Sequence, residues 1–237
     1  MRSGTSFRLL SRAFAALLAV LALAPGSALT AESVVVYSAR NEQLIKPLFD
    51  RFTAETGIPV KFTTADAAVL IERLAAEGKN SPADLLMTVD AGELWNAANR
   101  GLLRPTRSKI LEANIPVTLR DPGNRWVGLS QRARTIVYHP GRVDPSKLGR
   151  YEGLADPTWR GRLCLRSSKK VYNQSLVAMM IKAKGEAATE ATVRGWVANL
   201  AAPPFANDNQ VMEAIAAGQC DVGIVNTYYL GRMLQKQ

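Results

Sequence analysis

Residues 34–62 read VVVYSARNEQLIKPLFDRFTAETGIPVKF, and the pattern within this stretch indicates the fold class. Residues 34–37 form a β-branched run, after which apolar side chains return at helical spacing until Gly57 ends the helix. Residues 58–62 form the next short apolar run. A strand, a helix and a second strand of these lengths predict a right-handed βαβ unit with two parallel strands.

The same alternation of strands and helices continues through the chain. The other expected elements are strands at 84–87, 162–166 and 221–225, and helices at 67–76, 91–100, 171–184, 189–200, 209–217 and from about Tyr228. An extended stretch at 126–138 is interpreted as the crossover from a first lobe (residues 32–133) to a second lobe (residues 134–237). We therefore predict an α/β fold of two lobes with a cleft between them, and a ligand at the carboxyl ends of the strands.

The first 31 residues have the pattern of a secretory signal peptide. A basic start that contains Arg2, Arg8 and Arg12 is followed by an apolar run at 13–24 and then by small residues. The run is shorter than the roughly 20 residues that a membrane-spanning helix needs. We expect cleavage between residues 28 and 32 and export of the mature protein, and the alternative is an uncleaved anchor.

The composition is typical of a globular protein with a hydrophobic core. Apolar residues make up 47% of the 237 residues and charged residues 21%, close to the average for globular domains. Without the three arginines of the N-terminal segment, the formal net charge falls from +10 to +7, which is spread along the chain without interleaved aromatic residues and so does not indicate nucleic-acid binding. Cys164 and Cys220 are the two cysteines, and an even pair in an exported protein predicts a disulfide between neighbouring strands. The alternative is two buried free thiols.

Histidine-based catalysis is nearly excluded, because His139 is the one histidine of the chain and precedes Pro140 in an expected turn. The sequence contains no GxSxG nucleophile elbow, no HExxH zinc motif and no glycine-rich loop of the nucleotide-binding kind. Its carboxylates are scattered over expected helix faces. We therefore do not expect an enzyme, and a hydrolase that uses two carboxylates is the weak alternative.

Three tyrosines lie where expected strands and helices meet. Tyr172 is at the start of a helix, and the adjacent pair Tyr228 and Tyr229 follows the strand at 221–225. Neighbours within a strand point to opposite faces, so adjacent tyrosines converge only where a strand ends and a helix begins. Three phenolate oxygens would neutralise Fe(III), a hard cation that oxygen ligands suit. The alternative is three half-buried packing groups with solvated hydroxyls.

From residue 34 onward, the chain resembles the periplasmic ferric-ion-binding proteins of bacterial ABC iron importers. The resemblance is carried above all by WRGRLCLRSSKKVYNQSLVA at 159–178 and AIAAGQCDVGIVNTYYLGRM at 214–233. It implies a two-lobed Venus-flytrap fold and one Fe(III) between the lobes, bound by Tyr172, Tyr228 and Tyr229 with carbonate or a similar anion. It also implies a periplasmic location and an ABC permease in the inner membrane as the partner. We expect a monomer.

Arginine suits the anion because its guanidinium offers two parallel hydrogen bonds. The anion-binding candidates are Arg40, at the end of the first strand, and Arg132 at the crossover, with Arg134 as an alternative to Arg132. Ordinary surface solvation is the other interpretation of these arginines, and it fits Arg134 better than Arg40. Asn226 and Ser168 are candidates for supporting the tyrosines.

The chain departs from these relatives in two respects. Some relatives place a histidine or tyrosine ligand after the first strand and others a glutamate in the first lobe, where this chain has Asn41, Glu42, Val89 and Asp90. It therefore matches the relatives that bind iron through tyrosines alone. Relatives also continue past the tyrosine pair, whereas this chain stops at Gln237, so we expect a C-terminally incomplete fold. The alternatives are a binder of another solute, such as a phosphonate, polyamine or sugar, and a non-functional truncated product.

Overall fold

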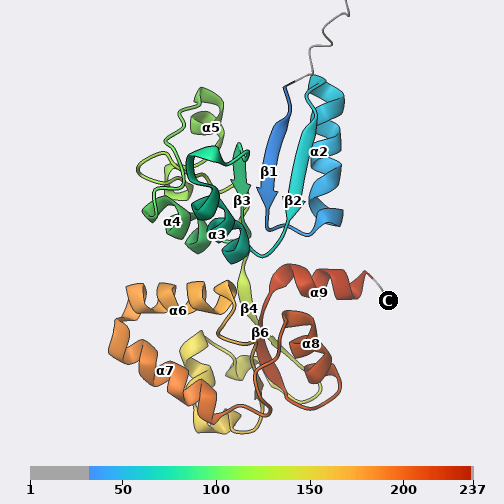
Figure 1. The fold of residues 1–237 in the computed structure, drawn as a ribbon. Coiled ribbons are helices and arrows are strands. Elements are labelled where there is room, and N and C mark those ends of the chain that lie inside the picture. The colour runs from blue at the N-terminus through green and yellow to red at the C-terminus, as the bar shows by residue number, and fades with distance from the viewer. Residues whose placement is uncertain (1–31, 236–237) are drawn as a thin grey trace, which may run out of the picture.

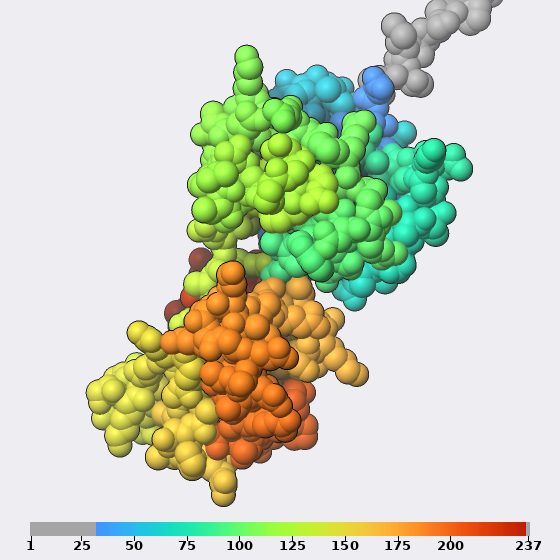
Figure 2. Space-filling model, turned by 90° about the vertical axis from the view of Figure 1, so that its left-hand side faces the viewer, coloured from blue at the N-terminus to red at the C-terminus, as the bar shows by residue number. Residues whose placement is uncertain are grey.

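The computed structural model describes residues 32–235, so the predicted signal peptide at residues 1–31 lies outside the described residues. The chain forms two lobes, each built on its own three-stranded sheet, with strand orders β2-β1-β3 and β4-β6-β5 (Figure 1). The space-filling view shows a narrow waist between the lobes (Figure 2). The predicted two-lobed α/β fold is confirmed. Within residues 32–235, no helix has the length and apolar character needed to cross a membrane.

The first lobe contains a parallel sheet, as the sequence predicts. Its middle strand, β1 (Val34–Ser38), pairs in parallel with β2 (Val60–Thr64) on one side and with β3 (Leu85–Met87) on the other. Gly57 ends the first helix of this lobe with a φ of 73°, a left-handed conformation that glycine adopts without strain. The helices of this lobe are α2 (Glu42–Thr56), α3 (Ala67–Glu77), α4 (Ala91–Asn99) and α5 (Lys109–Asn114). The last of them, α5, is not predicted, because its six residues are too few for a clear periodicity.

The second lobe contains a mixed sheet, which the alternating pattern does not predict. β4 (Arg134–Tyr138) runs antiparallel to β6 (Val222–Asn226), and β5 (Leu163–Cys164) pairs in parallel with the other side of β6. β4 enters this sheet directly from the first lobe, without the helical crossover that a parallel pairing requires. The extended stretch predicted at 126–138 is a strand only over its last five residues.

The helices of the second lobe lie close to their predicted positions. They are α6 (Val171–Lys184), α7 (Glu186–Ala198), α8 (Asp208–Ala216) and α9 (Thr227–Leu234). Short 3-10 helices occupy connections in both lobes: η1 (Gly78–Asn80), η2 (Val117–Leu119), η3 (Pro145–Lys147), η4 (Tyr151–Ala155) and η5 (Pro157–Trp159). Figure 1 shows α6 and α9 on the side of the second lobe that faces the first lobe, with β4 between them. Both helices therefore lie at the junction of the lobes.

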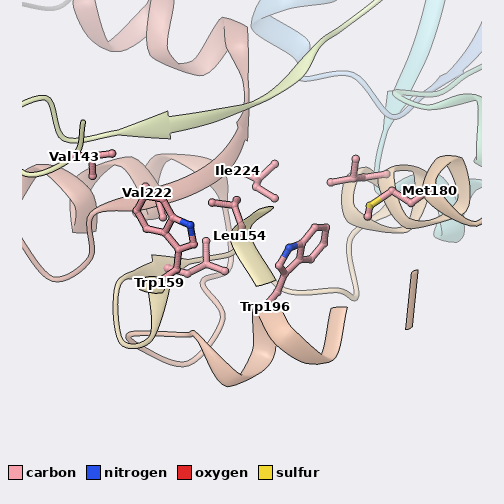
Figure 3. Close-up of a cluster of buried hydrophobic side chains, with 9 residues drawn as sticks. Val143, Leu154, Trp159, Met180, Trp196, Val222 and Ile224 are labelled. Carbon is pink, nitrogen blue, oxygen red and sulfur yellow. The ribbon is translucent and has the colours of Figure 1, made fainter. Parts of the chain in front are cut away.

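The larger hydrophobic core lies in the second lobe (Figure 3). Leu154, Trp159 and Trp196 pack there against inward-facing side chains of β5 and β6. A second cluster surrounds a disulfide between Cys164 and Cys220, whose Cα atoms are 5.9 Å apart. The predicted disulfide is confirmed, and it ties β5 to the residues that lead into β6.

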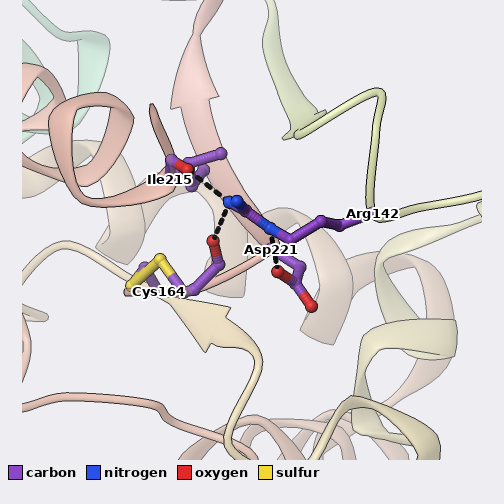
Figure 4. Close-up of a disulfide and its surroundings, with 5 residues drawn as sticks. Arg142, Cys164, Ile215 and Asp221 are labelled. Carbon is purple, nitrogen blue, oxygen red and sulfur yellow. Dashed lines mark hydrogen bonds and ion pairs between the residues drawn. A yellow bond between two sulfur atoms is a disulfide. The ribbon is translucent and has the colours of Figure 1, made fainter. Parts of the chain in front are cut away.

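Arg142 stabilises the turn that carries Cys220 (Figure 4). Its guanidinium donates to the backbone carbonyl oxygens of Ile215 and Cys220, at 2.6 and 3.2 Å. It also forms an ion pair with Asp221 at 2.7 Å, and Arg162 pairs with the other oxygen of Asp221 at 2.6 Å. The disulfide and this ion-pair cluster thus hold the same end of the sheet in place.

Candidate metal centre

Tyr228 and Tyr229 lie in the first turn of α9, directly after β6. The backbone N–H of Asn226, the last residue of β6, donates to Asp208 Oδ2 at 2.9 Å and so fixes the point where the strand becomes a helix. The ring centroids of the two tyrosines are 4.3 Å apart, and both side chains are half-buried. The ring of Tyr229 also packs against the core cluster around the disulfide. Adjacent tyrosines therefore lie together here, as predicted for a junction of strand and helix.

Tyr172 approaches this pair from the first turn of α6. Tyr172 and Tyr228 influence each other's pKa, which places Tyr172 close to the tyrosine pair. Two guanidinium groups lie over its ring, that of Arg132 at 4.7 Å and that of Arg166 at 5.0 Å from the ring centroid. Arg132 Nη1 also donates a hydrogen bond to the Tyr172 hydroxyl at 3.3 Å. Three phenol oxygens and an arginine donor are thus gathered at the starts of two helices.

The three tyrosines are electrostatically inequivalent. Burial acts to raise the pKa of Tyr228, but interactions of its oxygen with Tyr229, Asn226 and Tyr172 outweigh burial and lower that pKa. Burial raises the pKa of Tyr172, and its interaction with Tyr228 raises it further. The pKa of Tyr229 is raised for the same two reasons. Tyr228 is therefore the phenol that loses its proton most easily, because its two neighbours stabilise the resulting phenolate.

A buried ion-pair network connects the elements that carry the tyrosines. Asp208, at the start of α8, is fully buried and accepts from Arg134 at 3.0 Å and from Arg166 at 3.4 Å. Arg134 also donates to Asn226 Oδ1 at 3.0 Å and to Asn173 Oδ1 at 2.9 Å. Asn173 follows Tyr172 in α6, and Asn226 precedes the tyrosine pair. The network therefore sets the position of α6 relative to the turn between β6 and α9.

The network carries more positive than negative charge. Two guanidinium groups, from Arg134 and Arg166, share the one carboxylate of Asp208. The buried Nε atoms of both arginines have no hydrogen-bond partner among the described residues. A buried excess of positive charge lowers the cost of placing negative oxygens beside it. The surroundings of the three tyrosines thus favour anionic oxygen.

The structure brings together some of the predicted site residues but not all of them. Arg132 and Asn226 contact the tyrosines. Arg134 is a buried member of the network, so the interpretation as a solvated surface arginine is wrong for this residue. Ser168 offers its backbone carbonyl to Gln174, and within residues 32–235 its hydroxyl makes no hydrogen bond to a tyrosine.

Arg40, the other predicted anion-binding residue, is half-buried near the end of β1. Its backbone N–H donates to Ser38 Oγ at 3.2 Å. In the described part of the chain, its guanidinium forms no ion pair and contacts none of the three tyrosines. A role of Arg40 in binding an anion stays a prediction.

Two charged residues of the site are missed by sequence reasoning. Asp208 follows Asn207, which accepts from the N–H of Gln210, so it has the pattern of an ordinary residue in the first turn of a helix. Arg166 follows the two-residue strand β5 and has no local partner that would mark it as buried. One sequence feature could have pointed to Asp208 and Arg166: arginines outnumber aspartates in the segments around the tyrosine motifs. Within residues 32–235, no cluster of three or more histidine, cysteine, aspartate or glutamate side chains could hold a metal ion.

Comparison with known sequences identifies related proteins. A family model of bacterial extracellular solute-binding proteins matches residues 34–230. Iron uptake protein A1 of Synechocystis is 46% identical over 206 residues, which are 87% of this chain and 57% of that protein. The Fe(3+)-binding periplasmic protein of Serratia marcescens is 32% identical over 211 residues, covering 89% of this chain and 61% of that protein. The chain therefore spans about three fifths of the length of these relatives.

Solved structures match the same part of the chain. A Trichodesmium protein crystallised in complex with iron and citrate ligands is 44% identical, with a TM-score of 0.79, and the match covers 84% of this chain and 63% of that one. A ferric binding protein from Campylobacter jejuni is 38% identical, with a TM-score of 0.80, over 84% of this chain and 63% of that one.

Proposed function

The chain belongs to the family of bacterial extracellular solute-binding proteins, and we propose that it binds Fe(III) between its two lobes through the oxygens of Tyr172, Tyr228 and Tyr229. Members of this family bind solutes for transport and are not enzymes. The iron is the cargo of the protein, taken up in one place and released in another.

The observation that carries this proposal is the convergence of three phenol oxygens at the starts of α6 and α9. Fe(III) is small and highly charged, so it displaces the phenol protons and binds the phenolates, as cations generally do with acidic ligands. The N-terminal ends of two helices add to this preference, because a helix dipole stabilises negative charge at its start. Three phenolates balance the charge of the ion.

The arginines support a bound anion beside the iron. Once three phenolates neutralise Fe(III), the positive charges of Arg132, Arg134 and Arg166 exceed the negative charges of Asp90 and Asp208. Carbonate or a similar anion would restore the balance. Arg132 is placed to hold it, because it already donates to Tyr172, and Arg40 is a second candidate.

The proposal extends to transport. The relatives named above are an iron uptake protein and a periplasmic Fe(3+)-binding protein, so we assign this chain to the periplasm, with an ABC permease of the inner membrane as the partner that accepts the iron. We propose that it works as a monomer that binds no nucleic acid.

Optical absorption tests the proposal. Fe(III) and bicarbonate added to the purified protein should produce a visible band from charge transfer between tyrosinate and iron. The band should weaken strongly in Tyr172→Phe, Tyr228→Phe and Tyr229→Phe. Tyr138→Phe is the matched control, because Tyr138 is exposed in β4 at the end of the strand away from the turn that carries the pair. A wild type without a band, or variants that all behave like the control, would overturn the proposal.

Binding of an anionic solute without metal is the second candidate function. The observation in its favour is the excess of buried guanidinium groups around Asp208. In that case, phosphonate or citrate alone should raise the melting temperature of the protein, and the three Tyr→Phe variants should respond as the wild type does. Stabilisation that requires Fe(III) would rule this candidate out.

A further inference from the structure

Asp90 of the first lobe contacts the second lobe. It precedes α4, and its Oδ1 accepts from the backbone N–H of Gly92 at 2.9 Å, as a helix cap does. The same oxygen accepts from Ser175 Oγ, in α6 of the second lobe, at 2.8 Å. Figure 1 shows α4 and α6 facing each other across the junction of the lobes.

The backbone at this contact approaches α6 closely. A Cβ atom placed on Gly92 would lie 3.7 Å from Cγ2 of Val171 and 3.3 Å from Asp90 Oδ1. The start of α4 therefore lies within van der Waals reach of the first turn of α6, the helix that carries Tyr172. The hydrogen bond between Asp90 and Ser175 is thus part of a close contact between the lobes.

The second carboxylate oxygen of Asp90 reaches the tyrosines through an arginine. Asp90 Oδ2 lies 3.7 Å from Arg132 Nη2. The other terminal nitrogen of Arg132 donates to the Tyr172 hydroxyl at 3.3 Å, and its guanidinium lies over the Tyr172 ring. One carboxylate therefore contacts both the facing lobe and the arginine that orients a proposed iron ligand.

We propose that Asp90 couples closure of the two lobes to the position of Tyr172, with Ser175 as the contact that closes the lobes and Arg132 as the contact that orients the tyrosine. This inference rests on the proposed function, and it makes Asp90 a positioning residue. When the lobes separate, the bond to Ser175 breaks, and Arg132, at the crossover, no longer bridges Asp90 of the first lobe and Tyr172 of the second. When they close, both contacts form together, so closure and the geometry of the tyrosine site are energetically linked.

Capping alone does not account for these contacts. Asp144 and Asp156 also precede short helices, and among the described residues the carboxylate of each accepts hydrogen bonds only from the residue two positions ahead. A cap needs one carboxylate oxygen and one local N–H donor. Asp90 meets that need with Gly92, and its bonds to Ser175 and Arg132 are additional, directed at the other lobe and at the crossover.

Two substitutions separate the two contacts. Ser175→Ala removes the bond between the lobes and leaves the pairing of Asp90 with Arg132. Asp90→Asn keeps an oxygen acceptor for Gly92 and Ser175 but removes the charge that attracts Arg132. Asp90→Ala removes both contacts. Asp144→Asn is the matched control, because it replaces a capping aspartate whose side chain bonds only to Ser146.

The expected results differ between the variants. Ser175→Ala should release Fe(III) to excess EDTA about fivefold faster than the wild type, the effect of one lost hydrogen bond, with an unchanged absorption maximum. Asp90→Asn should shift the tyrosinate-to-iron band to shorter wavelength, because the freed guanidinium of Arg132 draws electron density from the Tyr172 phenolate. Asp90→Ala should show both effects. Small-angle X-ray scattering of iron-free Ser175→Ala and Asp90→Ala should give a larger radius of gyration than that of the wild type.

The outcomes of this test are distinct from those of the proposed function. A wild type without the absorption band overturns the proposed function, and the radii of gyration of the iron-free proteins still decide whether Asp90 holds the lobes together. If the wild type binds iron but the three variants match Asp144→Asn in release rate, band position and radius of gyration, the inference about Asp90 is wrong. A band position in Asp90→Asn identical to that of the wild type would also contradict it, because the charge of Asp90 would then not act on Tyr172 through Arg132.

Discussion

The two lobes differ in how firmly their parts are held together. In the second lobe, every residue of β6 is buried, a disulfide joins its start to β5, and a buried ion-pair network surrounds its end. In the first lobe, Leu44 and Leu48 on α2 and Trp95 on α4 are each about half exposed or more, at 48%, 55% and 60%. The core of the first lobe is smaller and is divided between the two faces of its sheet.

This difference matches a division of labour. The second lobe holds all three tyrosines on elements fixed by buried contacts, so the proposed binding of a metal ion there would cost little conformational entropy. The first lobe contributes Asp90, whose hydrogen bond with Ser175 forms at closure in the inference above. A rigid second lobe and a less firmly packed first lobe would let the three tyrosines stay together while the first lobe opens and closes over them.

The buried network offers the strongest test of this contrast. Asp208→Ala should destabilise the second lobe by about 3–5 kcal/mol, because it leaves Arg134 and Arg166 buried without a counter-charge. Urea unfolding followed by tryptophan fluorescence measures the change, because the second lobe buries Trp159 and Trp196. Glu72→Gln, which breaks the exposed pair with Arg100 in the first lobe, should leave the unfolding midpoint unchanged. Equal effects of the two substitutions would contradict the contrast between the lobes.

The disulfide should have the next largest effect. It closes a loop between residues 56 positions apart, so replacing both cysteines with alanine should cost about 2–4 kcal/mol, mainly by freeing the unfolded chain. Comparing urea unfolding of the oxidised protein with that of Cys164→Ala/Cys220→Ala measures the loss. The first lobe contains neither cysteine, so its own unfolding transition should be unchanged. A loss spread equally over both lobes would mean that they unfold as one unit.

Substitution of two helical glycines in the second lobe should change the stability by smaller amounts and in opposite directions. A Cβ atom on Gly195 would lie 2.5 Å from Cβ of Ala155 and 2.9 Å from its carbonyl oxygen, so Gly195→Ala should destabilise the protein by about 1–3 kcal/mol. Gly231 in α9 has open space around it, so Gly231→Ala should stabilise by about 0.5–1 kcal/mol through helix propensity. Thermal unfolding measures both. A neutral Gly195→Ala would mean that α7 and η4 pack loosely.

Acidification should lower the stability of both lobes gradually, and each aspartate should contribute less than the substitutions above. Burial acts to raise the pKa of Asp221, but hydrogen bonds from Arg162 and Arg142 outweigh it and lower that pKa. A lowered folded-state pKa stabilises the protein above the ordinary value of about 3.9, and the stabilisation is lost as the pH falls through the folded value. The melting temperatures of wild type and Asp221→Asn should therefore converge between about pH 5 and pH 2.

Asp121 provides the corresponding measurement in the first lobe. The hydrogen bond from Arg125 is the main cause of its lowered pKa, so the same loss of stability is expected on acidification. Asp121→Asn should remove that part of the pH dependence. If the melting temperature of Asp221→Asn or Asp121→Asn stays parallel to that of the wild type down to about pH 2, that aspartate does not contribute to the pH dependence of stability.

Local patterns account for the parts of the fold that were predicted. The bounds of α6 match the expectation, and α2 ends at Gly57 as the sequence indicates. These features depend on periodicity and on residues that cap a helix, which act over a few positions. The pairing of β4 was missed because Arg134 faces Asn226 in the sheet, and no pattern over a few residues reports a contact across that separation.

The candidate site was likewise predicted only in part. Tyr172, Tyr228 and Tyr229 could be proposed from the sequence because each lies at a recognisable boundary between elements. Asp208 and Arg166 were missed because their burial depends on which strands and helices surround them. A charged residue in an exposed first turn and one in a buried network have the same local sequence.

The sequence by itself determined the alternation of strands and helices, the disulfide and the identity of the phenol groups, because these follow from periodicity, cysteine number and residue chemistry. Only the tertiary structure decided that Arg134 is buried, that Asp208 pairs with it, and that Asp90 bonds to Ser175 in the other lobe. The physical reason is that a charge gains its partner, and loses its water, only when segments far apart in the chain are brought together.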